Sequence, residues 1–267
     1  MSSDRPLILI SNDDGIASPG LAALIEAVHP LGDVLVAAPL SPYSSAGRSL
    51  IWGSRTIERR TWPLAAVTAY AIDAAPALCV RVGLSLLAPR RPALMLSGIN
   101  LGENVGSDVT VSGTVGAALE AAANGVPAVA VSLEAPVEYH DNPRPGLDLR
   151  AAAAFAQRLA QGLLAHGMPA GADLLKVDVP NEPGRAFPWR ATRISRQMYW
   201  QTLVEESPDG SKRIIGYERQ WDSNVLEPDS DIYALVCERA ISISPMTVDL
   251  SARVDHADLA RLLAQRL

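Results

Sequence analysis

Short apolar runs alternate with longer amphipathic stretches along most of the chain. The runs predict β-strands at residues 7–11, 34–38, 93–96, 128–132 and 174–179. The stretches between them predict helices at residues 18–28, 76–88, 113–124 and 149–165. Repeated alternation of strand and helix is typical of a parallel sheet with right-handed crossovers. We therefore predict an α/β fold over residues 1–189, a Rossmann-like and mostly parallel sheet with helices on both faces.

The pattern changes in residues 190–267, which we expect to form a second segment. Residues 197–204 and 212–219 flank a Ser-Pro-Asp-Gly turn and predict a long β-hairpin. Because an isolated hairpin is marginally stable at best, we expect an arm that packs on a second subunit of a homodimer or homotetramer. Residues 241–244 predict a returning strand, and residues 256–267 predict a terminal amphipathic helix.

The composition narrows the class of protein. The 267 residues are 48% hydrophobic and 19% charged, as in ordinary globular proteins, with a net charge of -6. This charge argues against a general nucleic-acid-binding surface, which needs a basic face. The first apolar run is too short for a signal peptide or a membrane span, so we expect a cytoplasmic protein without membrane contact. Cys79 and Cys237 match no metal or redox spacing and are expected to be buried free thiols.

Polar residues follow three of the predicted strands at the point where each strand ends. Asp13 and Asp14 follow the first strand, a hydroxyl-rich loop at residues 41–49 follows the second, and residues 97–111, which include Asn100, follow the third. The carboxyl ends of parallel strands meet at one edge of a sheet, where ligands bind in open α/β folds. Carboxylate and amide oxygens at this edge suit a hard cation, so we predict one divalent metal ion, Mg²⁺ or Mn²⁺, per subunit.

A phosphate site is predicted beside the metal. Ser112 is the expected cap of the helix at residues 113–124, and amides at a helix N-terminus favour an anion. A cation next to such amides can activate and orient a transferring phosphoryl group. Taken alone, the Asp13-Asp14 motif is equally an ordinary polar turn, the glycine-spaced loop is a weaker signal still, and Ser112-Gly113-Thr114 is most often a plain helix cap. Their placement after strands of one predicted sheet favours the site.

The motifs together resemble the SurE family of survival protein E phosphatases, which act on nucleoside monophosphates. The resemblance rests on Asn12-Asp13-Asp14-Gly15, the loop at 44–49, Ser97-Gly98-Ile99-Asn100, Gly102, Asn104, Gly106, Asp108 and Ser112-Gly113-Thr114-Val115. It continues in the segments 177–181, 229–232 and 242–245 and therefore covers nearly the whole chain. The family implies a Rossmann-like core, a swapped C-terminal arm, dimers or tetramers, and one divalent metal.

The resemblance also implies roles for single residues. The metal ligands would be Asp13, Asp14, Ser44 and Asn100, where the choice of Ser44 over Ser45 rests on the family alone. Ser112, Gly113, Thr114 and Asn104 would face the phosphate. Asp13, Asp14 and Asn100 would be the catalytic residues, with Asp13 as nucleophile or general base.

Five positions depart from the family pattern or leave their role open. Ala75 and Leu78 stand where the family usually has Thr and Asp, which affects the expected substrate side of the pocket. Arg48 is either a solvated surface charge or a phosphate contact. Lys176 and Asp178 lie on a predicted strand, where they would pair with each other or face solvent.

The sequence therefore predicts a metal-dependent phosphomonoesterase that hydrolyses nucleoside 5′- and 3′-monophosphates. The alternative is a metal- and nucleotide-binding protein for sensing or assembly with little catalysis, motivated by Ala75 and Leu78. A P-loop is absent from the sequence, which argues against an ATP-driven enzyme. The four histidines fall outside the motifs, so we expect them at the surface or at helix ends: His29, His140, His166 and His256.

Overall fold

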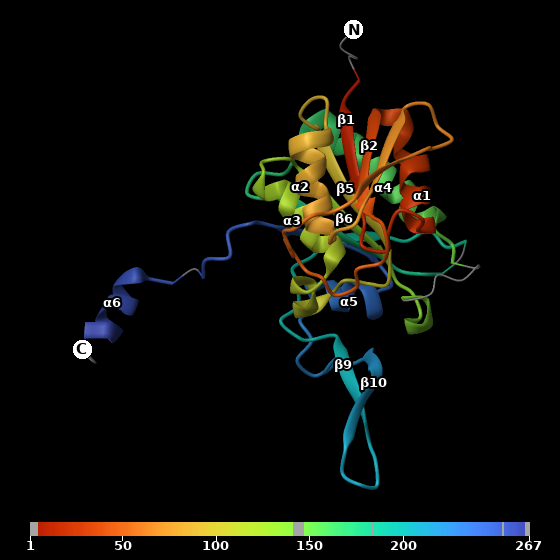
Figure 1. The fold of residues 1–267 in the computed structure, drawn as a ribbon. Helices are drawn as coiled ribbons and strands as arrows, with labels where there is room; N and C mark the ends of the chain where they lie inside the picture. Colours follow the sequence, from red (N-terminus) through yellow and green to blue (C-terminus); the bar gives the residue numbers. More distant parts are fainter. Residues whose placement is uncertain (1–4, 141–146, 183, 253, 265–267) are drawn as a thin grey trace.

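The computed structural model describes residues 5–140, 147–182, 184–252 and 254–264. Its centre is a nine-stranded sheet with the order β3-β4-β2-β1-β5-β6-β7-β11-β8 (Figure 1). The strands of this sheet are β1 (Leu7–Ser11), β2 (Asp33–Pro39), β3 (Ile57–Arg60), β4 (Val67–Ile72), β5 (Leu94–Leu101), β6 (Ala128–Leu133), β7 (Leu174–Val179), β8 (Trp189–Ala191) and β11 (Ile241–Met246).

Most neighbouring strands of the sheet run parallel. The antiparallel pairs are β3 with β4 and β11 with β7, and they lie toward the two edges. The parallel centre, β4-β2-β1-β5-β6-β7, has the strand-helix crossovers that the sequence predicts. The predicted α/β fold class is therefore confirmed. The boundary at residues 189 and 190 stays a prediction, and β11, which lies beyond it, extends the same sheet.

Helices cover both faces of the sheet (Figure 1). The longer helices are α1 (Pro19–Val28), α2 (Pro76–Val82), α3 (Gly113–Ala123), α4 (Arg150–His166), α5 (Asp231–Val236) and α6 (His256–Ala264). Short helical turns are η1 (His29–Leu31), η2 (Gly83–Leu87), η3 (Gly106–Thr110) and η4 (Val137–Tyr139). None of the helices in the described ranges combines the length and the apolar run that crossing a bilayer requires.

The central strand β1 shows why its sequence is a continuous apolar run. Ile8 and Ile10 pack with α1 and α4, whereas Leu7 and Leu9 pack with α2 and α3 on the other face. Successive side chains of a strand point to opposite faces, so a strand covered on both faces must be apolar at every position. The helix that follows starts where Ser18 accepts a hydrogen bond from the Gly20 amide at 3.2 Å.

Several elements were not predicted. β3, β4, β8 and α5 have no counterpart among the expected elements, and β5 extends five residues beyond its predicted end at residue 96. β3 is mostly exposed and β8 has three residues, so neither has the buried apolar pattern that identifies a strand. Residues 265–267 of the predicted terminal helix lie outside the described residues.

The predicted hairpin is present as β9 (Trp200–Glu206) and β10 (Lys212–Arg219), which pair antiparallel. It projects from the body of the molecule below the sheet, and α6 stands away on an extended segment (Figure 1). β9 starts at Trp200 rather than at residue 197; Tyr199, just before it, is fully buried and its amide donates to Asp108. Among the described cysteines, Cys79 and Cys237 are both free, as predicted, but only Cys79 is buried. The expectation that Cys237 is buried is wrong, because this residue lies at the exposed C-terminal end of α5.

Candidate active site

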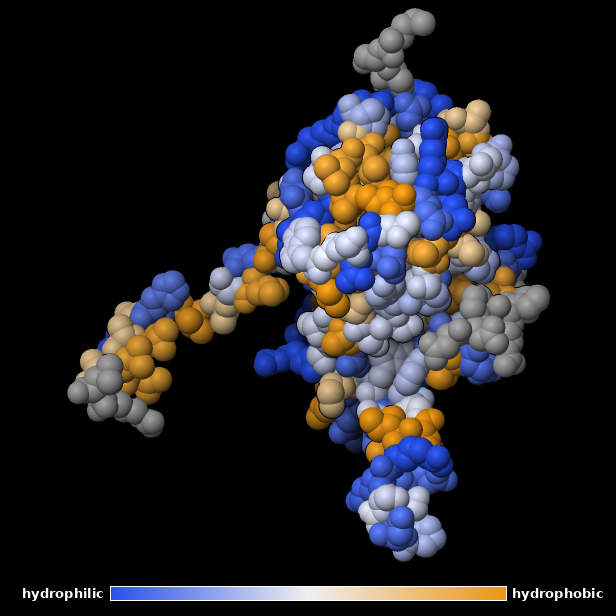
Figure 2. Space-filling model, viewed as in Figure 1, coloured by the Kyte–Doolittle hydropathy of each residue, from blue (hydrophilic) through white to orange (hydrophobic). Residues whose placement is uncertain are grey.

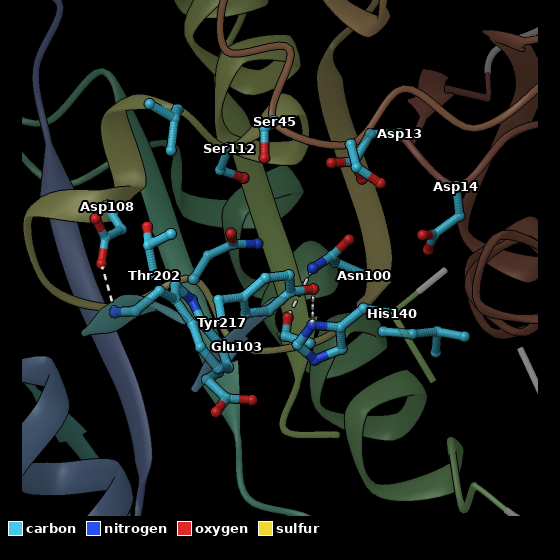
Figure 3. A pocket seen from close by; sticks show the side chains of 16 residues that line it. Asp13, Asp14, Ser45, Asn100, Glu103, Asp108, Ser112, His140, Thr202 and Tyr217 are labelled. Atoms are coloured by element: carbon cyan, nitrogen blue, oxygen red, sulfur yellow. Dashed lines mark hydrogen bonds between the residues drawn. The ribbon is translucent and has the colours of Figure 1, made fainter. Parts of the chain in front are cut away.

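A cavity of about 300 Å³ opens at the carboxyl edge of the parallel strands (Figure 3). β1 and β5 are parallel neighbours with Ser11 opposite Ser97, so the residues that follow them emerge side by side. The lining residues are Asp13, Asp14, Ser44, Ser45, Asn100, Leu101, Gly102, Glu103, Asn104, Asp108, Val111, Ser112, His140, Trp200, Thr202 and Tyr217. The structure thus brings Asp13, Asp14, Ser44 and Asn100, the four expected metal ligands, to one cavity.

Asp13 is buried and held at both carboxylate oxygens by Thr114 of α3. The Thr114 amide donates to Oδ2 at 3.1 Å, and the Thr114 hydroxyl donates to Oδ1. A Cβ at Gly113 would lie 2.9 Å from Oδ2 of Asp13, so only glycine lets the helix approach this closely. Burial raises the pKa of Asp13, and the hydrogen bonds from Thr114 oppose that rise.

Asp14 lies beside Asp13 and carries an unsatisfied oxygen. Burial, together with the charge of Asp13, raises the pKa of Asp14 to about 8. Its Oδ2 atom is buried and accepts no hydrogen bond from any described residue. Leaving a buried carboxylate oxygen without a partner is costly, which indicates that a cation or a proton belongs there.

Asn100 completes this group from the neighbouring strand. At Gly98, whose φ is +129°, the pairing of β5 with β6 shifts register, and a Cβ there would lie 2.3 Å from the Val131 carbonyl oxygen. Beyond this irregularity the Asn100 amide nitrogen donates to the Gly102 carbonyl at 2.7 Å. The Asn100 side-chain oxygen is therefore turned toward the two aspartates (Figure 3).

The donor set fits a hard divalent cation. Two carboxylates, one amide oxygen and the serine hydroxyls of the 44–45 turn are all oxygen ligands, as Mg²⁺ and Mn²⁺ prefer. In the described part of the chain, no group of three or more His, Cys, Asp or Glu side chains could hold a metal. A cation in this cavity would have carboxylate, amide and hydroxyl oxygens as its ligands.

Without metal, the stability of the protein should fall as pH rises from about 4 to about 8. The pKa of Asp14 rises from 3.8 in the unfolded chain to about 8 in the fold, so the folded state binds the extra proton and loses this stabilisation as pH passes the folded pKa. Thermal unfolding in EDTA at several pH values measures the slope. The fall in Tm with pH should be smaller in Asp14→Asn than in the wild type. Adding Mn²⁺ at pH 8 should raise the Tm of the wild type again. Equal slopes in the two proteins would contradict the assignment.

The N-terminus of α3 contacts both the cavity and Asp13, and its expected role toward a phosphate stays a prediction. Ser112 lines the cavity, but its hydroxyl accepts from the Val115 amide at 3.1 Å, and the Thr114 amide is taken by Asp13. Gly113 and Thr114 therefore lie behind Asp13 rather than on the cavity wall. Asn104 does line the cavity, and its side-chain amide donates to Ser132 at 2.9 Å.

The second wall of the cavity comes from the hairpin and from His140, which sequence reasoning missed. His140 bonds the Tyr217 hydroxyl through Nδ1 at 2.9 Å, and the two rings stack at 5.9 Å. Trp200 meets His140 edge to face at 5.4 Å. His140 caps the C-terminal end of η4, as expected of a helix-end histidine, and it also lines the cavity, which the sequence did not predict. No local motif signals this contact.

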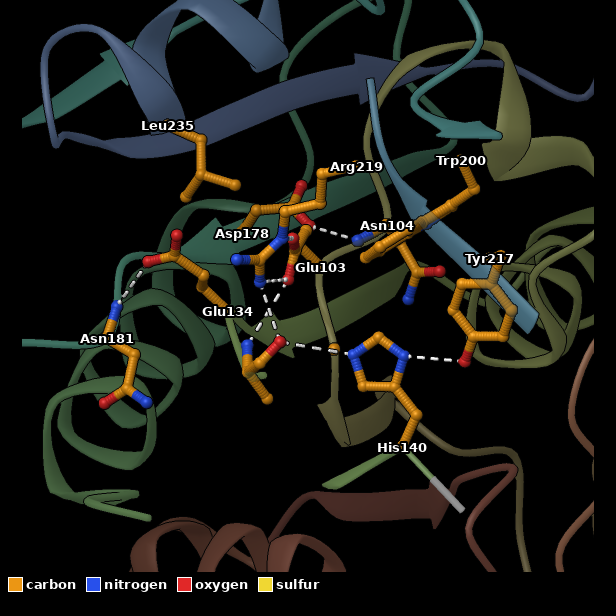
Figure 4. Close-up of polar contacts among 12 residues, drawn as sticks. Glu103, Asn104, Glu134, His140, Asp178, Asn181, Trp200, Tyr217, Arg219 and Leu235 are labelled. Atoms are coloured by element: carbon orange, nitrogen blue, oxygen red, sulfur yellow. Dashed lines mark hydrogen bonds and ion pairs between the residues drawn. The ribbon is translucent and has the colours of Figure 1, made fainter. Parts of the chain in front are cut away.

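The hairpin is fixed to the cavity by buried polar contacts (Figure 4). Glu103, which is fully buried, pairs with Arg219 of β10 through Nε at 2.5 Å. Asp108 accepts from the backbone amides of Tyr199 and Trp200 at 2.6 and 3.0 Å. The base of the hairpin is therefore part of the site, in addition to any role of the arm in assembly.

The structure also places the five residues whose role the sequence left open or that depart from the family pattern. Ala75 and Leu78 are buried at the start of α2, and neither is among the described residues that line the cavity. Lys176 and Asp178 pair with each other in the core, which confirms the first of their two expected arrangements. Arg48 is exposed, as expected of a surface charge, and it also pairs with the buried carboxylate of Glu120.

Comparisons with known proteins agree with these observations. A family model described as survival protein SurE matches residues 8–201. The 5′-nucleotidase SurE of Thermococcus gammatolerans is 38% identical over 259 residues, which cover 96% of this chain and 95% of that protein. The 5′-nucleotidase SurE of Moorella thermoacetica is 36% identical over 261 residues, which cover 97% of this chain and 96% of that protein. A crystal structure of the SurE protein from Aquifex aeolicus matches with a TM-score of 0.78 at 28% identity, covering 98% of this chain and 100% of that one. The chain therefore belongs to the SurE family.

Proposed function

We propose that this protein is a divalent-metal-dependent nucleotidase that hydrolyses nucleoside 5′-monophosphates, and 3′-monophosphates, to nucleoside and phosphate. The observation that carries the proposal is the cavity in which Asp13, Asp14 and Asn100 face an aromatic wall. Relatives that match over nearly the whole chain bear the name 5′-nucleotidase, which supports the same activity.

The metal would be held by Asp13, Asp14, Asn100 and Ser44. When bound, it would supply Lewis-acid activation of the phosphate. Asp13 is oriented by Thr114 at both oxygens, so its carboxylate has one fixed direction in the cavity. Ser112 and Asn104, on the cavity wall, would contact the phosphoryl oxygens.

Two roles for Asp13 fit this geometry. As general base it would take a proton from water, whose oxygen bonds to phosphorus while the ester P–O bond breaks and the leaving alkoxide gains a proton. As nucleophile its oxygen would bond to phosphorus while the ester P–O bond breaks and the leaving alkoxide gains a proton; water would then hydrolyse the acyl phosphate to phosphate and the free carboxylate. Acid quenching during turnover separates the two roles, because only the nucleophile leaves a trapped phosphoenzyme.

Phosphate release from a panel of nucleoside 5′- and 3′-monophosphates tests the function. The assay is run in EDTA and then with Mn²⁺ or Mg²⁺ in excess. We expect release only with metal, and the panel then ranks the substrates. If folded protein binds Mn²⁺ and releases no phosphate from any nucleotide, the proposal fails in favour of a non-catalytic binding protein.

Trp200 is expected to contact the base of the nucleotide. Stacking of a base on an aromatic ring contributes about 1–3 kcal/mol, so Trp200→Ala should raise KM for 5′-AMP by about 5- to 150-fold. Trp189→Ala is the matched control, since Trp189 is exposed on β8 and does not line the cavity. Ribose 5-phosphate, which has no base, should show no such increase with Trp200→Ala. An equal increase for both substrates would contradict a contact with the base.

Assembly through the C-terminal segments is the second part of the proposal. Leu259, Leu262 and Leu263 of α6 are about half exposed, and Ile214 and Ile215 of β10 are more exposed still. Apolar side chains gather across the hairpin and along α6 (Figure 2). Exposed apolar surface of this kind marks interfaces between proteins, so we expect a homodimer or homotetramer.

Light scattering after size-exclusion chromatography measures the oligomeric state. We expect at least a dimer for the full chain at micromolar concentration. A chain ending at residue 247, which lacks α6, should have a lower mass or a weaker association. A monomeric full chain would contradict the proposed assembly.

A further inference from the structure

The loop that carries Ser44 and Ser45 is anchored on both sides of these residues. We call residues 41–49 the serine loop. The Tyr43 amide donates to the Asp13 carbonyl at 2.8 Å, and the Gly47 amide donates to the Val111 carbonyl at 2.8 Å. Two bonds to residues at the cavity edge thus fix the backbone before and after the serines.

The far end of the serine loop rests directly on α3. A Cβ at Gly116 would lie 2.2 Å from the Gly47 carbonyl oxygen, so the loop backbone touches the helix backbone. The next residue, Arg48, donates from Nε to Oε2 of Glu120 at 2.8 Å. α3 therefore holds Asp13 through its first turn and the serine loop through its middle.

Glu120 is a fully buried carboxylate between two arginines. Oε2 accepts from Arg48, and Oε1 accepts from Arg81 of α2 at 2.6 Å and from Asn124 at 3.0 Å. Leaving a buried carboxylate without a counter-charge is costly, so Glu120 holds the guanidinium groups of both arginines in place. Of the two, only Arg48 belongs to the serine loop.

The geometry does not favour a direct phosphate contact for Arg48. Its Nε donates to Glu120, and Arg48 is not among the described residues that line the cavity. The loop beside it, by contrast, places both serines on the cavity wall next to Asp13 and Asp14.

We propose that the Arg48–Glu120 ion pair positions the serine loop so that its hydroxyls reach the metal site. Arg48 and Glu120 are then positioning residues, which act on the cation through Ser44 and Ser45 without touching it. This inference rests on the proposed metal site. Groups that hold a ligand in place typically change metal affinity by about 10–100-fold when they are removed.

The test is Mn²⁺ affinity, measured by electron paramagnetic resonance or calorimetry on the full chain. Arg48→Met is compared with Arg81→Met, because each variant removes one arginine from Glu120 and only the first releases the serine loop. We expect at least about tenfold weaker Mn²⁺ binding in Arg48→Met and less than about twofold change in Arg81→Met, with similar losses in Tm. At saturating Mn²⁺, KM for 5′-AMP should stay near wild type in Arg48→Met.

Other outcomes overturn the inference. Unchanged Mn²⁺ affinity with a raised KM would make Arg48 a phosphate contact, and equal losses of affinity in both variants would make the pair merely structural. If Arg48→Met does not fold, Arg48→Gln and Arg81→Gln provide the same comparison. If the wild type itself binds no Mn²⁺, the proposed metal site fails, which is distinct from failure of the positioning role.

Discussion

Replacing Asp13 by asparagine should lower the turnover of nucleoside 5′-monophosphates by about 10³-fold or more at saturating Mn²⁺, because the group that activates water or attacks phosphorus is lost. Asparagine is nearly the same size, and it can still accept a hydrogen bond from Thr114. The fold should therefore persist, and circular dichroism and Tm check this. Steady-state phosphate release measures the loss of turnover.

A control for this substitution lies at the tip of the hairpin. Asp209→Asn makes the same chemical change at an exposed turn, where Asp209 accepts from the amide and the hydroxyl of Ser211. Its activity should equal that of the wild type. Near-normal turnover by Asp13→Asn would remove Asp13 from its catalytic role, whichever of its two mechanisms is considered.

Replacing Lys176 by methionine should lower the free energy of unfolding by about 3–5 kcal/mol, since two buried carboxylates then lose their counter-charge. The Lys176 ammonium is fully buried, pairs with Asp178, and lies 3.0 Å from Oδ2 of Asp231. Asp178 in turn accepts from the Asn104 amide at 2.7 Å, and Asp231 accepts from the Gly106 amide at 3.1 Å. The same pairing therefore supports the loop that lines the cavity.

Lys212→Met is the matched control for stability. Lys212 pairs with Glu206 at 3.4 Å on the exposed hairpin, where an ion pair contributes about 0–1 kcal/mol. Urea unfolding followed by fluorescence and by circular dichroism gives both free energies and checks that the transition is two-state. Similar losses in the two variants would show that the buried cluster is not the stabilising element inferred here.

The centre of the site could be predicted because it depends on short-range sequence and on parallel topology. Asp13 and Asp14 directly follow one strand, and Asn100 belongs to the next strand in the sheet. Once the strands are predicted, the shared edge follows from the fold class. Ser112 could be placed by the capping preference of serine.

The remaining parts depend on contacts between distant segments. His140 and Tyr217 are separated by 77 positions, and Glu103 and Arg219 by 116, so no periodicity or spacing reveals either contact. The hairpin could be predicted from its turn, whereas its place on the cavity wall depends on tertiary packing. The pairing of Arg48 with Glu120 was missed for the same reason, since Glu120 is a single charge in an alanine-rich helix.

The exact use of α3 could not be predicted either. The sequence indicates a helix N-terminus suited to an anion, and the structure shows that the amide and the hydroxyl of Thr114 donate to Asp13. Capping preference indicates where the helix begins, but it does not indicate which side chain reaches its free amides. The glycine at 113 is explained only by the approach of Asp13.

The most direct test of the proposed site is to titrate metal-free protein with Mn²⁺ and to measure bound metal and phosphate release from 5′-AMP on the same samples. We expect one ion per subunit, with activity rising in proportion to occupancy, and Asp14→Asn should lose both. Full phosphate release in EDTA, or full occupancy by Mn²⁺ without activity, would contradict a metal-dependent nucleotidase at Asp13, Asp14 and Asn100.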